Sequence, residues 1–291
     1  MALAAVMAMT DSVPSSRSSA LVKRVATAVV FVPIFVWIVM RAPGWLFAAL
    51  VSATAALALW ELYRLFEHSG QPCFGRLGVA LGVALMASFE MAGTPGSTFA
   101  ALPALVLSVA VGVVMSAPIV TGGKPATEGV AITVLGVVYV SWLLGHVLLL
   151  HHRPDGDGLV LVLVGVTWVG ETAAYAVGST LGRHRLVPTI SPRKTVEGSV
   201  AQLVASIVAA VVLGPGWLLP TWSIGFAIGA GGILGVVGQV GDLAESAIKR
   251  SVGVKDAGGL IPGHGGVLDR IDGLLFNVPA LYYYVRLGSG A

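Results

Sequence analysis

The chain has 291 residues, of which 56% are apolar and only 11% are charged, with a formal net charge of +3. Soluble domains carry roughly 25% charged residues, so this chain has too little polar surface to cover a water-soluble globule, and lipid must surround much of it. The single cysteine, Cys73, excludes an intramolecular disulfide framework, and we expect no nucleic-acid partner.

A membrane-spanning helix needs about 20 mostly apolar residues, and nine stretches of this chain qualify. They lie at about 23–40, 45–66, 74–92, 98–116, 127–150, 158–181, 196–214, 222–248 and 272–287. We therefore predict an all-α, polytopic integral membrane protein with about nine transmembrane helices. Its predicted parts are a serine-rich, disordered cytoplasmic tail at 1–22, about five N-terminal helices at 23–157, and a catalytic region of about four helices with cytoplasmic loops at 158–291.

The basic residues predict the orientation, because cytoplasmic loops are enriched in Lys and Arg. With the N-terminus in the cytoplasm, 14 of the 17 basic residues fall on the inner side, and only Arg41, Arg153 and Arg286 fall outside. Adding or removing one span would exchange the sides of the later loops and remove this excess of basic residues on the inner side. We therefore expect a multi-pass protein of the inner or plasma membrane, with its active site facing the cytoplasm.

Charged residues in the first half suggest local roles. Glu61 and Arg64, three residues apart, are expected to pair near the cytoplasmic interface, and Glu90 to extend toward the outer interface. The pair His151-His152 could bind metal, but it also fits a simple turn in a short outer loop.

The sixth stretch contains Glu171, about ten residues from its cytoplasmic end. An ionisable residue inside a transmembrane segment is a functional candidate by default. We therefore include Glu171 among the candidate site residues.

The loop that follows contains the segment Ser191–Gly198. Ser191 or Thr195 could cap the seventh helix, and Glu197 would lie in its first turn, where the helix dipole favours an acid. This leaves Arg193 and Lys194 to face a polyphosphate or an anionic lipid head group.

The eighth stretch carries a polar face near its end. Asp242, Glu245, Ser246 and Lys249 are spaced i, i+3, i+4 and i+7, which places them on one side of a helix. Farther along, Asp269 and Asp272 open the last stretch, again three residues apart. The cations interleaved with these acids are Lys249, Arg250, Lys255 and Arg270.

Two readings of this constellation remain open. Carboxylates bind Mg²⁺, which completes its shell with waters and substrate phosphates, while cationic side chains hold other phosphate oxygens and glycine-rich backbone approaches an anion closely. The alternative is a set of internal salt bridges that fasten a cytoplasmic loop.

The segments Ser246–Arg250, Lys255-Asp256 and Pro262–Asp272 closely resemble the signature of bacterial phosphatidate cytidylyltransferases, also called CDP-diacylglycerol synthases. Ser191–Gly198 matches a second motif of that family, with Arg where Lys is usual at position 193. The family usually has Asp where Glu171 stands, in a W-x-x-D-x-x-A-Y pattern. The resemblance covers about 165–287.

The resemblance implies the reaction of CTP with phosphatidate to give CDP-diacylglycerol and pyrophosphate, by a Mg²⁺-dependent homodimer embedded in membrane lipid. It also implies that Asp242 and Asp269 hold the metal, with a monovalent cation, K⁺, nearby. The catalytic residues expected on this basis are Asp242, Asp269, Lys249, Arg250, Lys255, Arg270 and His264. The expected substrate-binding residues are Ser191, Arg193, Lys194, Glu197, Glu171, Ser246, Glu245, Asp256, Gly265, Gly266 and Asp272.

Rival classes fit less well. An ion-coupled secondary transporter would place its functional charges near the membrane midplane, whereas most candidates here lie at the cytoplasmic rim. Another CTP- or CDP-lipid transferase, a CDP-alcohol phosphotransferase, would need a D-G-x₂-A-R…G-x₃-D-x₃-D pattern, which the sequence does not contain.

Overall fold

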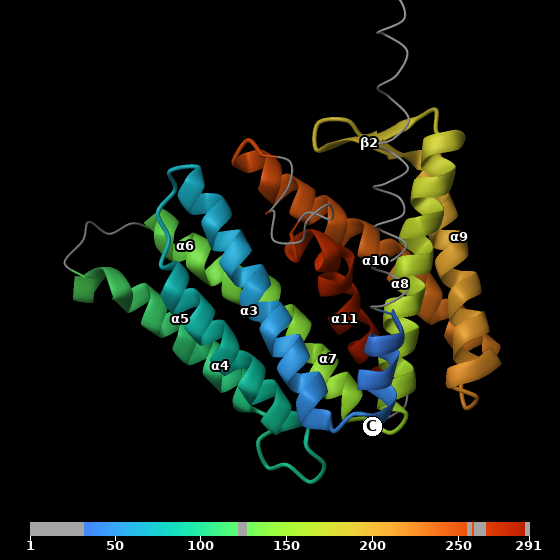
Figure 1. The fold of residues 1–291 in the computed structure, drawn as a ribbon, viewed down its shortest axis with the longest axis horizontal. Helices are drawn as coiled ribbons and strands as arrows, with labels where there is room; N and C mark the ends of the chain where they lie inside the picture. Colours follow the sequence, from blue (N-terminus) through green and yellow to red (C-terminus); the bar gives the residue numbers. More distant parts are fainter. Residues whose placement is uncertain (1–31, 122–126, 255–257, 259–265, 289–291) are drawn as a thin grey trace, which may run out of the picture.

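The computed structural model describes residues 32–121, 127–254, 258 and 266–288. Long helices lie side by side in this part of the chain, and each of the nine predicted stretches overlaps one of them (Figure 1). A short helix, Val32–Arg41, comes first. The others are α3 (Gly44–His68), α4 (Gly75–Gly93), α5 (Leu102–Thr121), α6 (Thr127–Gly136), α7 (Leu143–His151), α8 (Gly156–Thr180), α9 (Val196–Leu213), α10 (Ile224–Ser251) and α11 (Leu268–Gly288).

Two π-helical segments continue regular helices. The segment η1 (Val137–Trp142) joins α6 to α7, so that Thr127–His151 forms one long rod. The segment η2 (Gly214–Leu218) extends α9. Short π-helical insertions are uncommon and are frequently found at functional sites.

Seven of the described helices are long and apolar enough to cross a membrane, which confirms a multi-pass helical protein. The segment Val32–Arg41 is shorter than a span, and residues 23–31 of the first predicted stretch lie outside the described residues. The helix α11 is not among the seven, and its first turns carry Asp269, Arg270 and Asp272. The full count of nine spans stays a prediction.

Apolar side chains cover both the inside and the outside of this bundle. Leu59, Leu85 and Leu148 are fully buried between helices. On α9, by contrast, valines at every fourth position from Val200 to Val212 are 55–58% exposed. A stripe with this spacing lies on one helix face, and such an outward apolar face suits contact with lipid.

The connections alternate between two ends of the bundle. In Figure 1 the connections 94–101, 152–155 and 219–223 lie at the lower end, together with the C-terminal end of α11. The upper end holds the C-terminal end of α10 and a β-hairpin formed by β1 (Arg185–Val187) and β2 (Ser191–Thr195). This alternation agrees with the predicted order of loops, while the side that faces the cytoplasm stays a prediction.

The described part of the chain is all-α in class, and it also contains this short hairpin, which the sequence did not predict. Its antiparallel strands pair Arg185 with Thr195 and Val187 with Ser191. Ser191 therefore begins a strand and does not cap α9. Thr195 does cap that helix, because its Oγ1 accepts a hydrogen bond from the Gly198 N–H at 3.2 Å. Little in this polar stretch signals strands, since only Val and Thr residues favour them.

One local prediction in the first half is wrong. The Arg64 guanidinium lies over the Trp60 ring, 4.8 Å from its centroid, and the buried Glu61 points to the start of α11 instead of pairing with Arg64. Near the end of α4, the Glu90 carboxylate lies 3.1 Å from His152 Nε2, and its extension toward the outer interface stays a prediction.

The histidine pair fastens the turn that it was predicted to form. His152 is held by the Glu90 carboxylate of α4. His151 Nε2 lies 3.3 Å from Asp157 Oδ1, in the first turn of α8. The two rings therefore tie the end of α7 to its neighbours.

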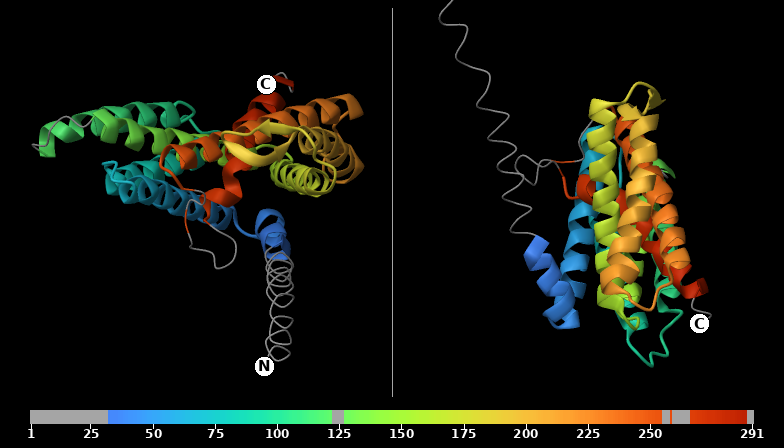
Figure 2. Two further views of the ribbon diagram at one scale, coloured as in Figure 1. Left: turned by 90° about the horizontal axis from the view of Figure 1, so that it is seen from above. Right: turned by 90° about the vertical axis from the view of Figure 1, so that its right-hand side faces the viewer.

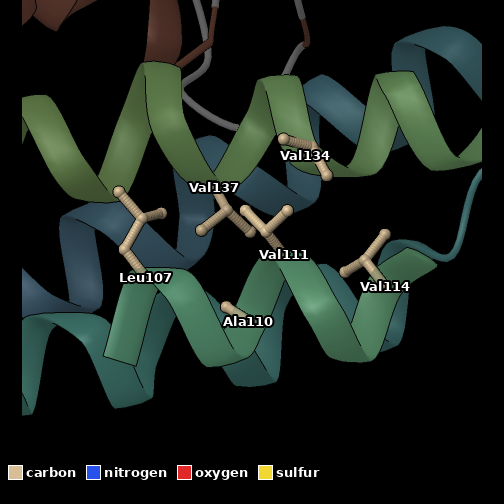
Figure 3. A pocket seen from close by; sticks show the side chains of 6 residues that line it. All are labelled: Leu107, Ala110, Val111, Val114, Val134 and Val137. Carbon is tan, nitrogen blue, oxygen red and sulfur yellow. The ribbon is translucent and has the colours of Figure 1, made fainter. Parts of the chain in front are cut away.

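The contact between α5 and α6 is entirely aliphatic (Figure 3). It is lined by Leu107, Ala110, Val111, Val114, Val134 and Val137. Side chains of this kind offer a charged ligand no hydrogen bonds, so a polar site has to be sought at the upper end of the bundle.

Candidate active site

The predicted polar face of α10 forms as the spacing requires. Ser246 Oγ donates to Asp242 Oδ1 at 3.5 Å, and the Lys249 ammonium group contacts the Glu245 carboxylate one turn earlier. Three other elements reach this face: the hairpin, the start of α11 and the helix α8. Figure 2 shows from above that the hairpin lies across the ends of α8, α9 and α10.

Both carboxylates predicted to bind metal are paired with a lysine. Lys194 Nζ, from β2, lies 2.7 Å from Asp242 Oδ2. Lys249 Nζ lies 2.7 Å from Asp269 Oδ1 and bridges it to Glu245. The second cluster is the more buried one, with 12% of the Lys249 side chain exposed and 1% of Glu245.

Asp269 is also held by the backbone. Its Oδ2 accepts a hydrogen bond from the Gly266 N–H at 2.9 Å. Burial raises the pKa of Asp269, but the hydrogen bonds from Lys249 and Gly266 outweigh it and hold the pKa below its ordinary value. Asp269 is therefore ionised at neutral pH, as a cation ligand has to be.

A cleft of about 450 Å³ opens between α8, α9, α10 and the hairpin. Its volume lies within the range of roughly 300–1,000 Å³ that is usual for small-molecule sites. Its charged lining consists of Glu171, Asp242, Arg185, Arg193 and Lys194. Acids and cations predicted from separate motifs therefore share one cavity.

Glycines make room where α8 and α9 form the wall of this cleft. A Cβ added to Gly198 of α9 would lie 2.8 Å from the Ala174 carbonyl oxygen and 3.3 Å from the Gly178 Cα, both in α8. The backbones therefore approach more closely than any larger residue would allow.

Glu171 belongs to the same group of charges. Its side chain faces α11, since a Cβ added to Gly273 would lie 2.5 Å from Glu171 Oε1. The charges that act on it include those of Asp272, Asp242 and Lys194. The fold thus brings the acid of α8 to the acids of α10 and α11.

The remaining predicted residues of α11 fix its first turns. Asp272 Oδ1 accepts from the Gly273 N–H at 2.8 Å, and Asp272 acts electrostatically on Glu171. Arg270 is exposed, and its charge also acts on Glu171.

Two predicted residues support the hairpin and do not line the cleft. Arg250 Nε donates to the Ile190 carbonyl at 3.2 Å, and Arg250 Nη1 donates to the Val254 carbonyl at the same distance. Glu197 turns to His184, whose Nδ1 lies 2.7 Å from Glu197 Oε1. In these positions Arg250 and Glu197 tie the two ends of the hairpin to α10 and α9.

Four predicted residues lie outside the described part of the chain. They are Lys255, Asp256, His264 and Gly265. Their assigned roles stay predictions.

The structure adds two residues that sequence reasoning missed. Glu61 of α3 contacts the start of α11, and its only sequence signal was that of an acid within an apolar stretch. The Tyr139 hydroxyl, in η1, is buried without a hydrogen-bond partner among the described residues, and the charges of Glu245, Asp272 and Asp242 act on it. No sequence pattern marked Tyr139.

The described residues show no group of three or more His, Cys, Asp or Glu side chains arranged to hold a metal ion. Mg²⁺ needs fewer, since it is commonly bound by one or two carboxylates plus waters and substrate phosphates. Asp242 and Asp269 each hold an ammonium group already, so both positions favour a cation. These two residues fit the predicted ligand role, which stays a prediction.

Comparison with known proteins gives a family and partial relatives. Residues 22–288 match the Cytidylyltransferase family. The chain is 40% identical over 158 residues to the uncharacterized protein YnbB of Escherichia coli (strain K12), covering 54% of this chain and 52% of that protein. It is 39% identical over 158 residues to a phosphatidate cytidylyltransferase of Staphylococcus saprophyticus, covering 52% of this chain and 57% of the relative. A phosphatidate cytidylyltransferase of Staphylococcus aureus (strain COL) is 34% identical over 171 residues, covering 58% and 64%. The chain thus spans 52–64% of the length of these relatives.

Proposed function

Because the chain belongs to the cytidylyltransferase family, we propose that it transfers the cytidylyl group of CTP to phosphatidate, forming CDP-diacylglycerol and pyrophosphate. The observation that carries the proposal is the cleft in which Glu171 and Asp242 face Arg185, Arg193 and Lys194. A cavity that combines cations with carboxylates suits a polyphosphate together with its metal ion. Two relatives are also named phosphatidate cytidylyltransferase.

The proposed reaction is a substitution at phosphorus. A phosphate oxygen of phosphatidate attacks the α-phosphorus of CTP, and the bond from that phosphorus to the pyrophosphate oxygen breaks. The nucleophile is already anionic, so the obstacles are repulsion between the two substrates and charge that develops on the leaving group. Catalysis of this kind depends on positioning and on electrostatic stabilisation.

The cationic residues of the cleft would meet these obstacles. Lys194 and Arg193 project from β2, and Arg185 donates from β1 to the Arg193 carbonyl at 3.5 Å, which steadies the pair of strands. Guanidinium groups bind phosphate oxygens in a bidentate manner, whereas an ammonium group acts as a point charge. A magnesium ion held by Asp242 and Asp269, with K⁺ nearby, would further neutralise phosphate charge when bound.

The arrangement also suggests how the two substrates arrive. If the hairpin end faces the cytoplasm, CTP enters the cleft from the water phase. Tyr175, a lining residue that is 77% exposed, lies on the α8 side of the cleft, and α9, which also lines the cleft, carries the outward valine stripe. Phosphatidate would enter from that side with its acyl chains still in lipid. Homodimer formation belongs to the same proposal.

A label-transfer assay tests this function. The purified protein in detergent, with phosphatidate, Mg²⁺ and α-labelled CTP, should move label into the lipid fraction and release pyrophosphate. Asp242→Asn and Asp269→Asn should abolish transfer while the protein stays folded, and Asp157→Asn at the opposite end of the bundle should keep it. Full activity in Asp269→Asn would refute the metal assignment.

Other outcomes of the assay separate the rival functions. If the label entered a different lipid acceptor, the protein would still be a cytidylyltransferase, but phosphatidate would not be its substrate. Substrate counterflow in vesicles without any turnover of CTP would support a transporter instead.

A further inference from the structure

A carboxylate from the N-terminal half reaches the start of α11. Glu61 is 1% exposed, and its Oε2 accepts a hydrogen bond from the Leu268 N–H at 2.9 Å, although the two residues are 207 positions apart. Glu61 is thus the acceptor for the first N–H group of α11.

Such a contact has a clear physical basis. The first N–H groups of a helix have no partner within the helix, and the helix dipole favours a negative charge at this end. Most helices satisfy these groups with a side chain of their own N-cap residue. Here the acceptor comes from α3, so the position of α11 depends on a second helix.

The chain before α11 is shaped around this carboxylate. A Cβ added to Gly266 would lie 2.6 Å from Glu61 Oε2, and one added to Gly258 would lie 2.8 Å from Glu61 Oε1. At contacts this short, a side chain at either position would have to displace the Glu61 carboxylate. Both glycines therefore let the backbone approach Glu61 closely.

Glu61 contacts the start of α11, and two acids of the candidate site, Asp269 and Asp272, lie in the first turns of that helix. Asp269 follows Leu268 directly, accepts from the Gly266 N–H and binds Lys249. Asp272 lies three residues farther on and acts electrostatically on Glu171 in the cleft wall. A displacement of the first turn of α11 would move both acids.

We propose that Glu61 is a positioning residue that fixes the first turn of α11, and so sets the placement of Asp269 and Asp272 for the transfer reaction. The N-terminal half would thereby take part in catalysis without touching a substrate, since Glu61 does not line the cleft among the described residues. This inference rests on the proposed function for its kinetic part and on the hydrogen bond to Leu268 for its structural part.

Three variants test the proposal. Glu61→Ala removes the acceptor, and Glu61→Gln keeps an oxygen that can accept from Leu268 while it removes the charge. Glu67→Ala is the matched control, because Glu67 is an exposed acid of the same helix. Gly258→Ala would place a Cβ 2.8 Å from Oε1 of the same carboxylate and so displace it.

In label transfer we expect Glu61→Ala to lower kcat by about tenfold to a hundredfold, the range typical of lost orienting contacts. The KM for CTP should change by less than about threefold, because the cleft itself is intact. Glu61→Gln should keep most of kcat, Gly258→Ala should lose it as Glu61→Ala does, and Glu67→Ala should match the wild type.

Hydrogen exchange supplies a readout that does not need activity. Amides of 266–272 should exchange faster in Glu61→Ala than in the wild type, while Glu61→Gln keeps them protected. Exchange that is unchanged in Glu61→Ala would overturn the inference even if the wild type had no transferase activity.

The kinetic outcomes separate this inference from the proposed function. A wild-type protein that transfers no label would refute the proposed function. An active wild type with an equally active Glu61→Ala would overturn the inference alone. Equal loss of kcat in Glu61→Ala and Glu61→Gln would also overturn it, because the charge and not the hydrogen bond would then be required.

Discussion

Removing the Lys249 ammonium group should strongly destabilise the protein. Only 12% of its side chain is exposed, and it contacts two buried carboxylates, Glu245 at 1% and Asp269 at 11% exposure. Loss of one partner from a buried ion pair leaves an uncompensated charge and costs about 3–5 kcal/mol. We expect Lys249→Met to lower the free energy of unfolding by that amount. Lys194→Met should cost about 1 kcal/mol or less, because the Lys194 and Asp242 side chains are 24% and 35% exposed and solvent screens the pair.

Unfolding in a titration with sodium dodecyl sulfate, followed by circular dichroism, measures both values. The double variant Lys249→Met/Glu245→Gln should recover part of the loss, since one of the stranded charges is then removed. If Lys249→Met unfolded within about 1 kcal/mol of the wild type, the cluster would not be a tightly buried ion pair, and the reasoning from burial would be refuted.

Two further predictions concern the cleft wall and the thiol. Gly198→Ala should force α8 and α9 apart, because the new Cβ would lie 2.8 Å from a backbone carbonyl of α8. We expect the free energy of unfolding to fall by about 1–3 kcal/mol in the same assay. Gly232→Ala is the control, since nothing lies within 4 Å of a Cβ there. Burial, followed by the charge of Glu67, raises the pKa of Cys73 to about 11. The neutral thiol should therefore predominate below that pH. Alkylation by iodoacetamide should be slow at pH 8, and its rate should rise toward pH 11. Rapid alkylation at pH 8 would contradict this environment of Cys73.

Hydropathy was sufficient to locate the helices, because a membrane span is set by length and apolarity alone. The stretch predicted at 45–66 became α3 (Gly44–His68), and the stretch predicted at 222–248 became α10 (Ile224–Ser251), whose greater length was also expected. The polar face of α10 was predictable for a similar reason. Helical periodicity alone places Ser246 one turn after Asp242, and Lys249 one turn after Glu245, on the same face of the helix.

Contacts between distant segments were not predictable in the same way. The partner of Glu61 was expected three residues away, at Arg64, but it lies 207 residues away at Leu268. Periodicity describes which face of a helix is polar and does not say which other helix covers it. The hairpin was missed for another reason, because its strands are short and contain mostly polar residues.

The structure also shows that the two readings of the charged motifs are compatible. Lys249, Glu245 and Asp269 form a buried cluster that does not line the cleft among the described residues, as expected of salt bridges that fasten α10 to α11. Lys194 and Asp242 form a more exposed pair that does line it, as expected of groups that meet a ligand. The polar face of α10 therefore contributes both to the buried cluster, through Glu245 and Lys249, and to the lining of the cleft, through Asp242. It follows that substitutions at Lys249 and Glu245 should act first on stability, whereas substitutions at Lys194 should act first on the affinity for CTP.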